Sequence, residues 1–242
     1  MVGLGDFFGF FRGAGRTGRL QGLDPEASAA GARYTVFDTE LTGLDEKSDN
    51  VISIGAVRIT EGRIPAGDTL YMLVDPEAGV FRRDGVVIHG ITPSDVAGRP
   101  VIDEAVYELY RFIGSDIMVG HCLSIDLGFL DRELKRIIGR GLDSPAADTY
   151  RIHQWLIAKD PEYRELVGKT KNGGLYEMAE KMGITVRDAH NAQMDAYITA
   201  QVFQRQLHLL AAKGVTTLGR LLRIADPHEG GDISSGIGDI RF

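Results

Sequence analysis

The stretch VFDTELTGL, from Val36 to Leu44, decides how the rest of the chain is interpreted. It begins with apolar and β-branched residues that favour a strand, and its Thr-Gly pair favours a turn. Between them, Asp38 and Glu40 are separated by one residue, so on a strand both side chains point to the same face while Thr39 points away. The strand therefore ends with two carboxylates held side by side.

Two adjacent carboxylates repel each other and lose solvation. They tend to take up protons, to pair with a basic side chain or to bind a cation. Oxygen ligands of this kind suit Mg²⁺ or Mn²⁺. The alternative is a solvated strand end that leads into a turn, and an Asp-x-Glu pattern is too short to decide between the two. The case for a metal therefore depends on other acids in the chain.

The segments that follow Arg33 predict an α/β fold. RYTVFD and VISIGAVRIT are β-branched runs, and EGR forms a turn between the second run and IPAGDTLYMLV, which predicts three antiparallel strands. RPVIDEAVYELYRFI has helical spacing, IMVGH is a short buried strand, and SPAADTY is a short fifth strand. Later helices are expected over residues 150–158, 175–182 and 192–212. This order predicts a mixed five-stranded sheet, three antiparallel strands and then parallel additions, flanked by helices.

Two further acids and a histidine lie at the starts of predicted helices. SIDLGFLDRELKRIIG has Ser124 as its expected N-cap and Gly139 at its end, which puts Asp126 in the first turn. Asp195 lies in HNAQMDAYITAQVF, whose apolar spacing indicates a core-facing helix, and His190 comes five residues earlier. Residues five apart in one helix are about 140° apart around its axis, so His190 reaches the same site only from the loop or first turn. Capping or dipole stabilisation would explain either acid alone.

The composition limits the class of protein. The net charge of −7 and the pI near 5.4 do not support a strongly basic surface, so a nucleic-acid partner must be held by local positive patches or bound cations. Cys122 is the only cysteine, which excludes an intramolecular disulfide and a cysteine-rich zinc cluster and fits a reducing, cytoplasmic location. No secretory signal and no run of roughly 20 apolar residues is present, so no membrane association is expected.

The chain is expected to divide into three parts. Residues 1–31 form a flexible leader rich in glycine, whose four closely spaced phenylalanines either pack locally or dock on a partner. Residues 32–212 form the main domain. Residues 213–242 form a C-terminal helix within TTLGRLLRIA and a tail rich in glycine and serine.

The four acids and the histidine together indicate a function more specifically than any one of these residues does alone. The chain resembles the DEDDh 3′-to-5′ exonucleases, the DnaQ-like family that includes the proofreading ε subunit of bacterial DNA polymerase III. The resemblance runs from about residue 34 to residue 210 and is carried by DTELTGL, VISIGAVRI, VIHGITPSDV, VGHCLSIDLGFLDREL, DTY and HNAQMDA. A sister group has tyrosine four residues before the last acid, where this chain has Asn191. The resemblance implies a ribonuclease H-like fold and makes residues 32–212 an exonuclease domain.

The resemblance also implies the catalytic residues. His190 corresponds to the general base of the family, and a neutral imidazole would take a proton from the attacking water. Two divalent cations, Mg²⁺ or Mn²⁺, would hold the attacking and leaving oxygens of an in-line phosphoryl displacement. The implied products are nucleoside 5′-monophosphates. The metal-binding acids, which complete the catalytic set, would be Asp38, Glu40, Asp126 and Asp195.

The sequence indicates the substrate-binding residues less clearly than the catalytic residues. Leu41, Cys122 and Ile125 replace residues that are common in the family, and Leu41 is a candidate wedge under the last base. Cys122 has the alternative, and favoured, interpretation of a small core residue. His89 lies in VIHGIT, which is expected to position a loop beside the cleft. The substrate-binding positions implied by the family are Thr39, Leu41, Thr42, His89, Cys122 and Ile125.

The expected partner is a nucleic acid with a free 3′ end. DNA is favoured over RNA because IHGIT resembles the DNA-cutting group, and the role would be in proofreading or repair, alone or beside a DNA polymerase or another replication or repair protein. Trimming of RNA or oligoribonucleotides is the alternative within the same chemistry. A module that binds nucleic acid or protein without cutting is the alternative from another class, and the intact set of acids argues against it.

Overall fold

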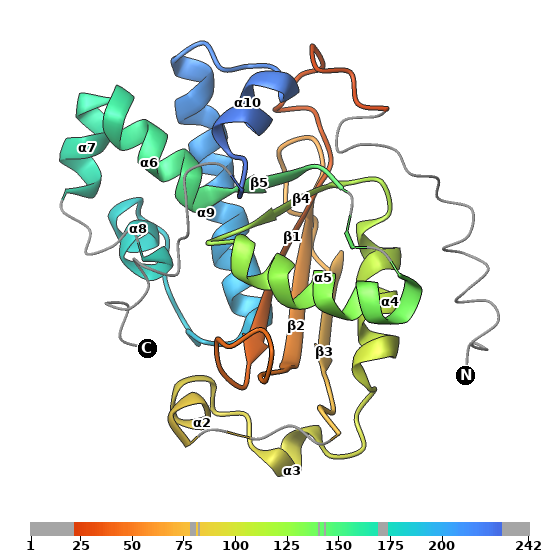
Figure 1. Cartoon of the computed structure of the whole chain (residues 1–242). Coiled ribbons are helices and arrows are strands. Elements are labelled where there is room, and N and C mark those ends of the chain that lie inside the picture. Colours follow the sequence, from red (N-terminus) through yellow and green to blue (C-terminus); the bar gives the residue numbers. More distant parts are fainter. Residues whose placement is uncertain are drawn as a thin grey trace.

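A five-stranded mixed sheet with strand order β3-β2-β1-β4-β5 forms the centre of the molecule (Figure 1). β1 (Tyr34–Leu41) pairs antiparallel with β2 (Val51–Ile59), which pairs antiparallel with β3 (Thr69–Leu73). On its other side β1 pairs parallel with β4 (Ile117–Gly120), which pairs parallel with β5 (Ala146–Asp148). The predicted fold class is confirmed.

The computed structural model describes residues 22–77, 81, 83–139, 141–142, 144–168 and 174–228. The phenylalanines of the predicted leader and the last part of the predicted tail lie outside these residues. None of the helices in the described ranges has the length and apolar character needed to cross a bilayer.

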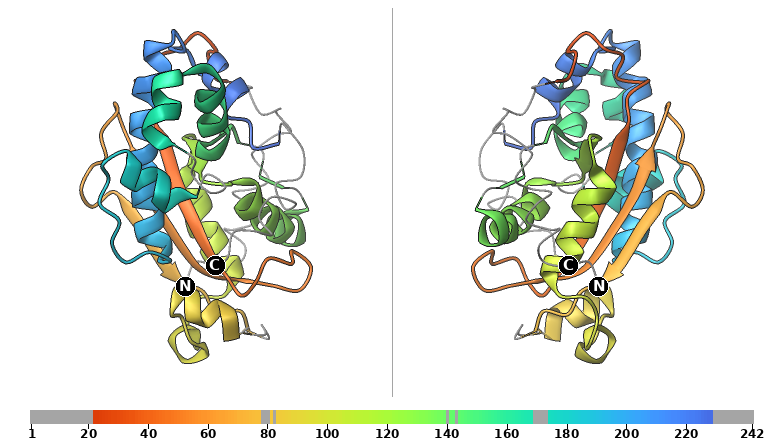
Figure 2. Two further views of the ribbon diagram at one scale, coloured as in Figure 1. Left: turned by 90° about the vertical axis from the view of Figure 1, so that its left-hand side faces the viewer. Right: turned by 90° about the vertical axis from the view of Figure 1, so that its right-hand side faces the viewer.

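Helices cover both faces of the sheet. Figure 2 shows α9 on one side of it and the α4–α5 pair on the other, while α2 and α3 lie beyond the end of the sheet at which β1 ends (Figure 1). The helices are α2 (Arg83–His89), α3 (Pro93–Val96), α4 (Ile102–Ile113), α5 (Ser124–Ile138), α6 (Thr149–Lys159), α7 (Pro161–Val167), α8 (Leu175–Lys181), α9 (Ala192–Ala212) and α10 (Leu218–Ile224).

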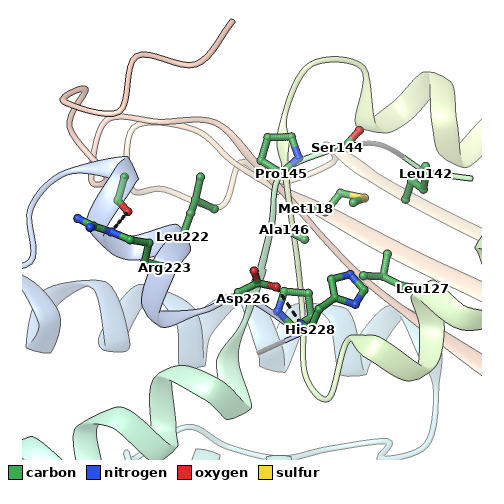
Figure 3. A pocket seen from close by; sticks show the side chains of 12 residues that line it. Met118, Leu127, Leu142, Ser144, Pro145, Ala146, Leu222, Arg223, Asp226 and His228 are labelled. Carbon is green, nitrogen blue, oxygen red and sulfur yellow. Dashed lines mark hydrogen bonds between the residues drawn. The ribbon is translucent and has the colours of Figure 1, made fainter. Parts of the chain in front are cut away.

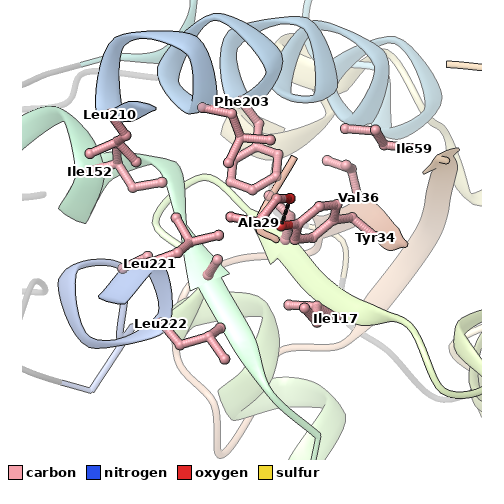
Figure 4. Close-up of a cluster of buried hydrophobic side chains, with 14 of the residues drawn as sticks. Ala29, Tyr34, Val36, Ile59, Ile117, Ile152, Phe203, Leu210, Leu221 and Leu222 are labelled. Carbon is pink, nitrogen blue, oxygen red and sulfur yellow. Dashed lines mark hydrogen bonds between the residues drawn. The ribbon is translucent and has the colours of Figure 1, made fainter. Parts of the chain in front are cut away.

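The alternation along β1 decides which helix each side chain meets. Tyr34 and Val36 point into the cluster formed with α6, α9 and α10, where the Tyr34 ring meets Phe203 edge-on at 4.9 Å between centroids (Figure 4). Phe37 points into the opposite cluster, formed with α4 and α5. Because successive side chains on a strand alternate, Asp38 continues the α9 side and Thr39 the α5 side.

Gly55 of β2 allows α9 to approach this part of the sheet. It pairs with Asp38 across the antiparallel ladder, and a Cβ at this position would lie 2.2 Å from the carbonyl carbon of Ala192. A larger residue would push the start of α9 away from the sheet. The glycine therefore brings the first turn of α9 beside the end of β1.

The two ends of the described chain pack together. The Ala29 N–H donates to the Thr216 carbonyl at 2.9 Å, and the Leu218 N–H donates to the Ala27 carbonyl at 2.9 Å. Ala29 and Leu218 are buried in the same cluster as Tyr34. The core therefore includes parts of residues 22–31 and 213–228, and the division of the chain into three parts stays a prediction.

All the predicted helices are found, including α10 within TTLGRLLRIA, but some boundaries differ and three further helices are present in the described residues. Ser124 is not the N-cap of α5: it is the first helical residue, Leu123 holds the cap position, and no side chain caps this end. The third strand starts at Thr69 because residues 65–68 form a turn, with the Asp68 N–H bonded to the Pro65 carbonyl at 3.3 Å. In addition, α2, α3 and α7 were not predicted, and α3 has only four residues, which is too few to show a periodic apolar pattern.

Candidate active site

Three of the predicted acids form a compact group. Asp38 and Glu40 end β1 on the side covered by α9, and Asp195 lies in the first turn of α9. One carboxylate oxygen from each of the three lies within 4.8 Å of the others. Residues from opposite ends of the domain therefore converge, as the sequence predicts.

Asp126 approaches from the opposite side of β1. It lies in the first turn of α5, and its Oδ1 accepts hydrogen bonds from the Thr39 N–H at 3.1 Å and from the Thr39 hydroxyl at 2.6 Å. Its charge contributes to the raised pKa values of Asp38 and Glu40, although its oxygens are not within the compact group. The fourth acid thus belongs to the same electrostatic site and is attached to the strand through Thr39.

Burial raises the pKa of every acid in the site, and the charges of neighbouring acids raise it further for Asp38, Glu40 and Asp126. Burial, followed by the charges of Asp195 and Asp126, raises the pKa of Glu40 to about 8. Burial likewise raises the pKa of Asp126 to about 7 and that of Asp195 to about 6. For Asp38, burial and then the three neighbouring acids hold the pKa well above its usual range. Without a counter-charge, the site retains protons that exposed carboxyl groups would lose.

The donor set fits a hard divalent cation. Asp195 Oδ1 is buried and has no hydrogen-bond partner among the described residues, although buried polar atoms are nearly always satisfied. It belongs to one of the three carboxylates of the compact group. An all-oxygen site suits Mg²⁺ or Mn²⁺, and a cation would supply the charge that these acids lack.

The metal-free protein is expected to lose stability as the pH rises. Because the folded-state pKa values of Glu40 and Asp126 lie above the usual carboxyl values of about 4, the folded protein holds protons that the unfolded chain has released. The free energy of unfolding therefore falls as the pH passes through about 7 to 8. Melting in EDTA, scanned from about pH 7 to pH 8.5 so that the histidines contribute little, should show Tm falling by several degrees.

The control for this scan is the same protein with saturating Mn²⁺. A bound cation replaces the protons, so Tm should be higher and nearly independent of pH across the same range. A Tm in EDTA that does not change with pH would contradict the raised carboxyl pKa values.

His190 lies immediately before the N-cap of α9, as the helix geometry predicts. Its backbone is left-handed, with φ of 62°, and its N–H donates to the Tyr176 hydroxyl at 2.8 Å. The Tyr176 hydroxyl in turn donates to Asp195 Oδ2 at 2.7 Å, and the two rings meet edge-on at 5.1 Å. Burial lowers the pKa of the His190 imidazole, which favours its neutral form. The predicted base therefore lies beside the acid group.

Two residues of this region were not predicted as parts of the site. Tyr176 lies in LYEMAEK, where nothing but the three-dimensional structure connects it with His190. Asp148, at the end of β5, is buried, and its carboxylate accepts the backbone N–H groups of Cys122, Leu123 and Tyr150 at 3.0, 3.2 and 2.8 Å. It caps α6 and holds the loop that leads into α5. The only sequence signal for it was the DTY motif.

The predicted substrate-binding residues surround the acids in different ways. The Thr42 hydroxyl donates to Asp49 Oδ1 at 3.2 Å and accepts the Asn50 N–H at 3.0 Å, so it stabilises the loop after β1. Leu41 and Ile125 are partly buried against the α4–α5 cluster. Their contact with substrate, like that of Thr39, whose hydroxyl binds Asp126, stays a prediction.

His89 and Cys122 lie beside the site, the first at the end of α2 and the second in the loop before α5. His89 ends α2, its Nδ1 accepts the Ile91 N–H at 3.0 Å, and its pKa is lowered by burial and by the charge of His190. Cys122 is half-buried with a left-handed φ of 54°, and burial raises the pKa of its thiol. It belongs to none of the described core clusters, so the core interpretation does not hold, and its substrate contact stays a prediction.

Replacing Thr39 with Val should weaken the site without removing an acid. The change deletes the hydroxyl that donates to Asp126 Oδ1, and this hydrogen bond lowers the pKa of Asp126. The loss should raise the metal concentration needed for half-maximal cleavage by roughly 10-fold, the lower end of the effect of removing a group that orients a ligand. Metal titration of cleavage measures it. Thr39→Ser keeps the hydroxyl and should behave like the unchanged protein; equal effects of Val and Ser would refute this role.

A separate cavity of about 190 Å³ lies between β4, β5, α5 and α10 (Figure 3). Its lining includes Met118, Leu127, Leu222, Arg223 and Asp226. None of the predicted catalytic residues lines it, so it is not part of the acid site.

Comparison with known proteins identifies the family. The family model described as Exonuclease (RNase_T) matches residues 35–203. The chain is 33% identical over 198 residues to the DNA polymerase III subunit epsilon-like protein of Rhodobacter capsulatus, covering 81% of this chain and 26% of that protein. It is 30% identical over 207 residues to the PolC-type DNA polymerase III of Thermotoga petrophila, covering 86% of this chain and 14% of that protein.

A relative of similar size is the DNA polymerase III subunit epsilon of Aquifex aeolicus. It is 30% identical over 178 residues, which cover 73% of this chain and 81% of that protein. The chain spans only about a quarter or less of the two longer relatives.

Solved structures share the fold. E. coli exonuclease I in complex with a dT13 oligonucleotide gives a TM-score of 0.63 at 17% identity, covering 75% of this chain and 43% of that chain. Exonuclease X in complex with 5′ overhanging duplex DNA gives a TM-score of 0.57 at 22% identity, covering 79% and 98%. The chain belongs to the DnaQ-like exonuclease family and has its ribonuclease H-like fold.

Proposed function

We propose that this protein is a metal-dependent 3′-to-5′ exonuclease that removes nucleotides from single-stranded or frayed DNA ends. The observation that carries the proposal is the group formed by Asp38, Glu40 and Asp195, in which Asp195 Oδ1 is buried and lacks a hydrogen-bond partner among the described residues. Relatives named as DNA polymerase III subunits support DNA as the substrate and a role in proofreading or repair.

The four acids would hold two Mg²⁺ or Mn²⁺ ions. Three of them supply the compact group, and Asp126 contributes from the α5 side. When bound, such ions would offset the negative charge of the acids and stabilise the attacking and leaving oxygens of the displacement. With their charge offset in this way, the acids would no longer repel a polyanionic strand, although the protein has a net charge of −7.

His190 would act as the general base. Its pKa is lowered by burial, so it is neutral near pH 7 and can take a proton from the attacking water as the new phosphorus–oxygen bond forms. The bond between phosphorus and the 3′ oxygen of the preceding nucleotide breaks. The released product is a nucleoside 5′-monophosphate, and the shortened strand keeps its 3′ oxygen.

The test uses single-stranded DNA and RNA of one sequence, each labelled at the 5′ end, with purified protein and Mg²⁺ or Mn²⁺. The expected result is a ladder of DNA strands shortened stepwise from the 3′ end, and no ladder for Asp38→Ala. A strand whose 3′ end is blocked by an inverted linkage should resist. Immediate release of the 5′ label would overturn the direction, a ladder with RNA alone would overturn the substrate, and no cutting of either would overturn the enzyme.

A further inference from the structure

The Tyr176 hydroxyl connects the proposed base with one of the proposed metal-binding acids. It donates to Asp195 Oδ2 at 2.7 Å, accepts the backbone N–H of His190 at 2.8 Å, and lies 3.4 Å from His190 Nδ1. Tyr176 comes from α8, whereas His190 and Asp195 flank the start of α9. One atom from a separate helix thus touches both groups.

The hydrogen-bonding capacity of these groups restricts where the protons lie. A phenol has one proton to donate, and an ionised carboxylate can only accept. Since the Tyr176 proton goes to Asp195 Oδ2, the hydroxyl has only acceptor capacity left for the imidazole. His190 Nδ1 can therefore contact it only as an N–H donor. In a neutral imidazole this leaves Nε2 with the free lone pair.

The same hydroxyl binds only one of the two carboxylate oxygens of Asp195. Oδ2 is occupied by Tyr176, while Oδ1 is the buried oxygen that has no hydrogen-bond partner in the described part of the chain. A carboxylate held at one oxygen presents the other in a fixed direction. Groups that orient ligands in this way commonly change metal affinity or activity by about 10- to 100-fold when removed.

Packing holds Tyr176 in place. Its neighbours on α8, Met178 and Ala179, are fully buried in a cluster with Ile198 and Val202 of α9. The Tyr176 ring meets the His190 ring nearly perpendicularly, with 89° between their planes. The hydrogen bond from the His190 N–H to the Tyr176 hydroxyl also stabilises the left-handed backbone conformation of His190, which is uncommon for residues other than glycine.

We propose that Tyr176 is a positioning residue: its hydroxyl holds His190 in the Nδ1–H tautomer, so that Nε2 accepts the proton from water, and fixes Asp195 so that Oδ1 faces the cation. The role of Nε2 rests on the proposed function of His190 as a base. The tautomer and the cation affinity can be measured without any turnover. They therefore test Tyr176 independently of cleavage.

The first experiment determines the tautomer by NMR. Protein with ¹⁵N-labelled histidine is examined at about pH 8, where the imidazole is neutral, and His190→Ala assigns the signals. The unchanged protein should carry the proton on Nδ1 of His190. In Tyr176→Phe, which keeps the ring, His190 should shift toward the Nε2–H form. Finding Nε2–H in the unchanged protein would overturn the tautomer assignment.

A second tyrosine–histidine pair supplies the matched control. The Tyr163 hydroxyl contacts His153 Nδ1 at 2.7 Å in the interior between α6 and α7. Tyr163→Phe makes the same chemical change there. Because the Tyr163 hydroxyl also contacts Met178 Sδ of α8 at 3.5 Å, this variant also tests whether a disturbance of α8 alone reaches His190. The His153 signals should change and the His190 tautomer should not. If Tyr163→Phe changes the His190 tautomer as much as Tyr176→Phe does, a general structural effect explains the result and the positioning role is refuted.

The second experiment measures Mn²⁺ binding by calorimetry and then cleavage rates at saturating Mn²⁺. Tyr176→Phe should bind Mn²⁺ about 10- to 100-fold more weakly and show a reduced kcat with little change in KM, whereas Tyr163→Phe should match the unchanged protein in both. Tyr176→Phe with unchanged Mn²⁺ affinity and kcat would overturn this inference alone. If the unchanged protein does not shorten DNA or RNA, the proposed function fails, and the tautomer and Mn²⁺ data still decide the role of Tyr176.

Discussion

Replacing Asp38 with Asn is expected to abolish cleavage and, at the same time, to stabilise the metal-free protein. Activity should fall by at least about 10³-fold, since charge stabilisation by a bound cation contributes several kcal/mol to the barrier. Stability should rise because burial and three neighbouring acids hold the pKa of Asp38 well above its usual range, and Asn carries no charge to be neutralised. The two effects have the same origin.

Melting in EDTA at about pH 8 measures the second effect, and each kcal/mol gained should raise Tm by about 2–4 °C in a protein of this size. The matched control is Asp116→Asn, because Asp116 is a buried acid whose charge is compensated. It binds Arg58 Nε at 2.7 Å and Arg33 Nε at 3.1 Å, so its replacement should lower Tm. A similar drop in Tm for Asp38→Asn would show that the Asp38 carboxylate is not under repulsion.

Replacing His190 with Ala should reduce kcat by roughly 10²- to 10⁴-fold, the usual contribution of a positioned base. Mn²⁺ affinity should change much less, because the imidazole is not one of the oxygen ligands of the acid group. Single-turnover rates at saturating Mn²⁺ separate the two quantities. In the unchanged protein the rate should fall as the pH drops through the lowered pKa of His190, and this dependence should disappear in the variant.

The control for this variant is His208→Ala. His208 is exposed on the later part of the same helix, so its loss should leave turnover unaltered. Full turnover of His190→Ala at neutral pH would exclude His190 as the base.

The sequence was sufficient to predict the sheet and the converging residues. Alternation along β1 places Asp38 and Glu40 on one side, and the spacing of His190 and Asp195 requires the histidine to precede the helix, as the structure has it. These two local predictions succeed because they depend on periodicity, which a single strand or helix imposes on its own residues. That Asp195 meets Asp38 and Glu40 was implied only by the resemblance to the family.

The supporting contacts were not predictable because they join residues that no periodic pattern relates. Nothing in LYEMAEK distinguishes Tyr176 from an ordinary helical tyrosine, and its partners lie beyond the next loop. Ser124 was assigned as a cap from its residue type, whereas the loop before α5 is held by the carboxylate of Asp148, which lies in a different strand. Short helices such as α3 contain too few residues to show an apolar stripe.

The close fit between Gly55 and Ala192 has a consequence for the order in which the protein is made. The five strands of the sheet precede α9 in the chain, so Asp38 and Glu40 are synthesised before Asp195 and His190. The Asp38–Glu40 pair alone cannot complete the acid group. The acid group is therefore complete only when the last long helix has docked against the glycine.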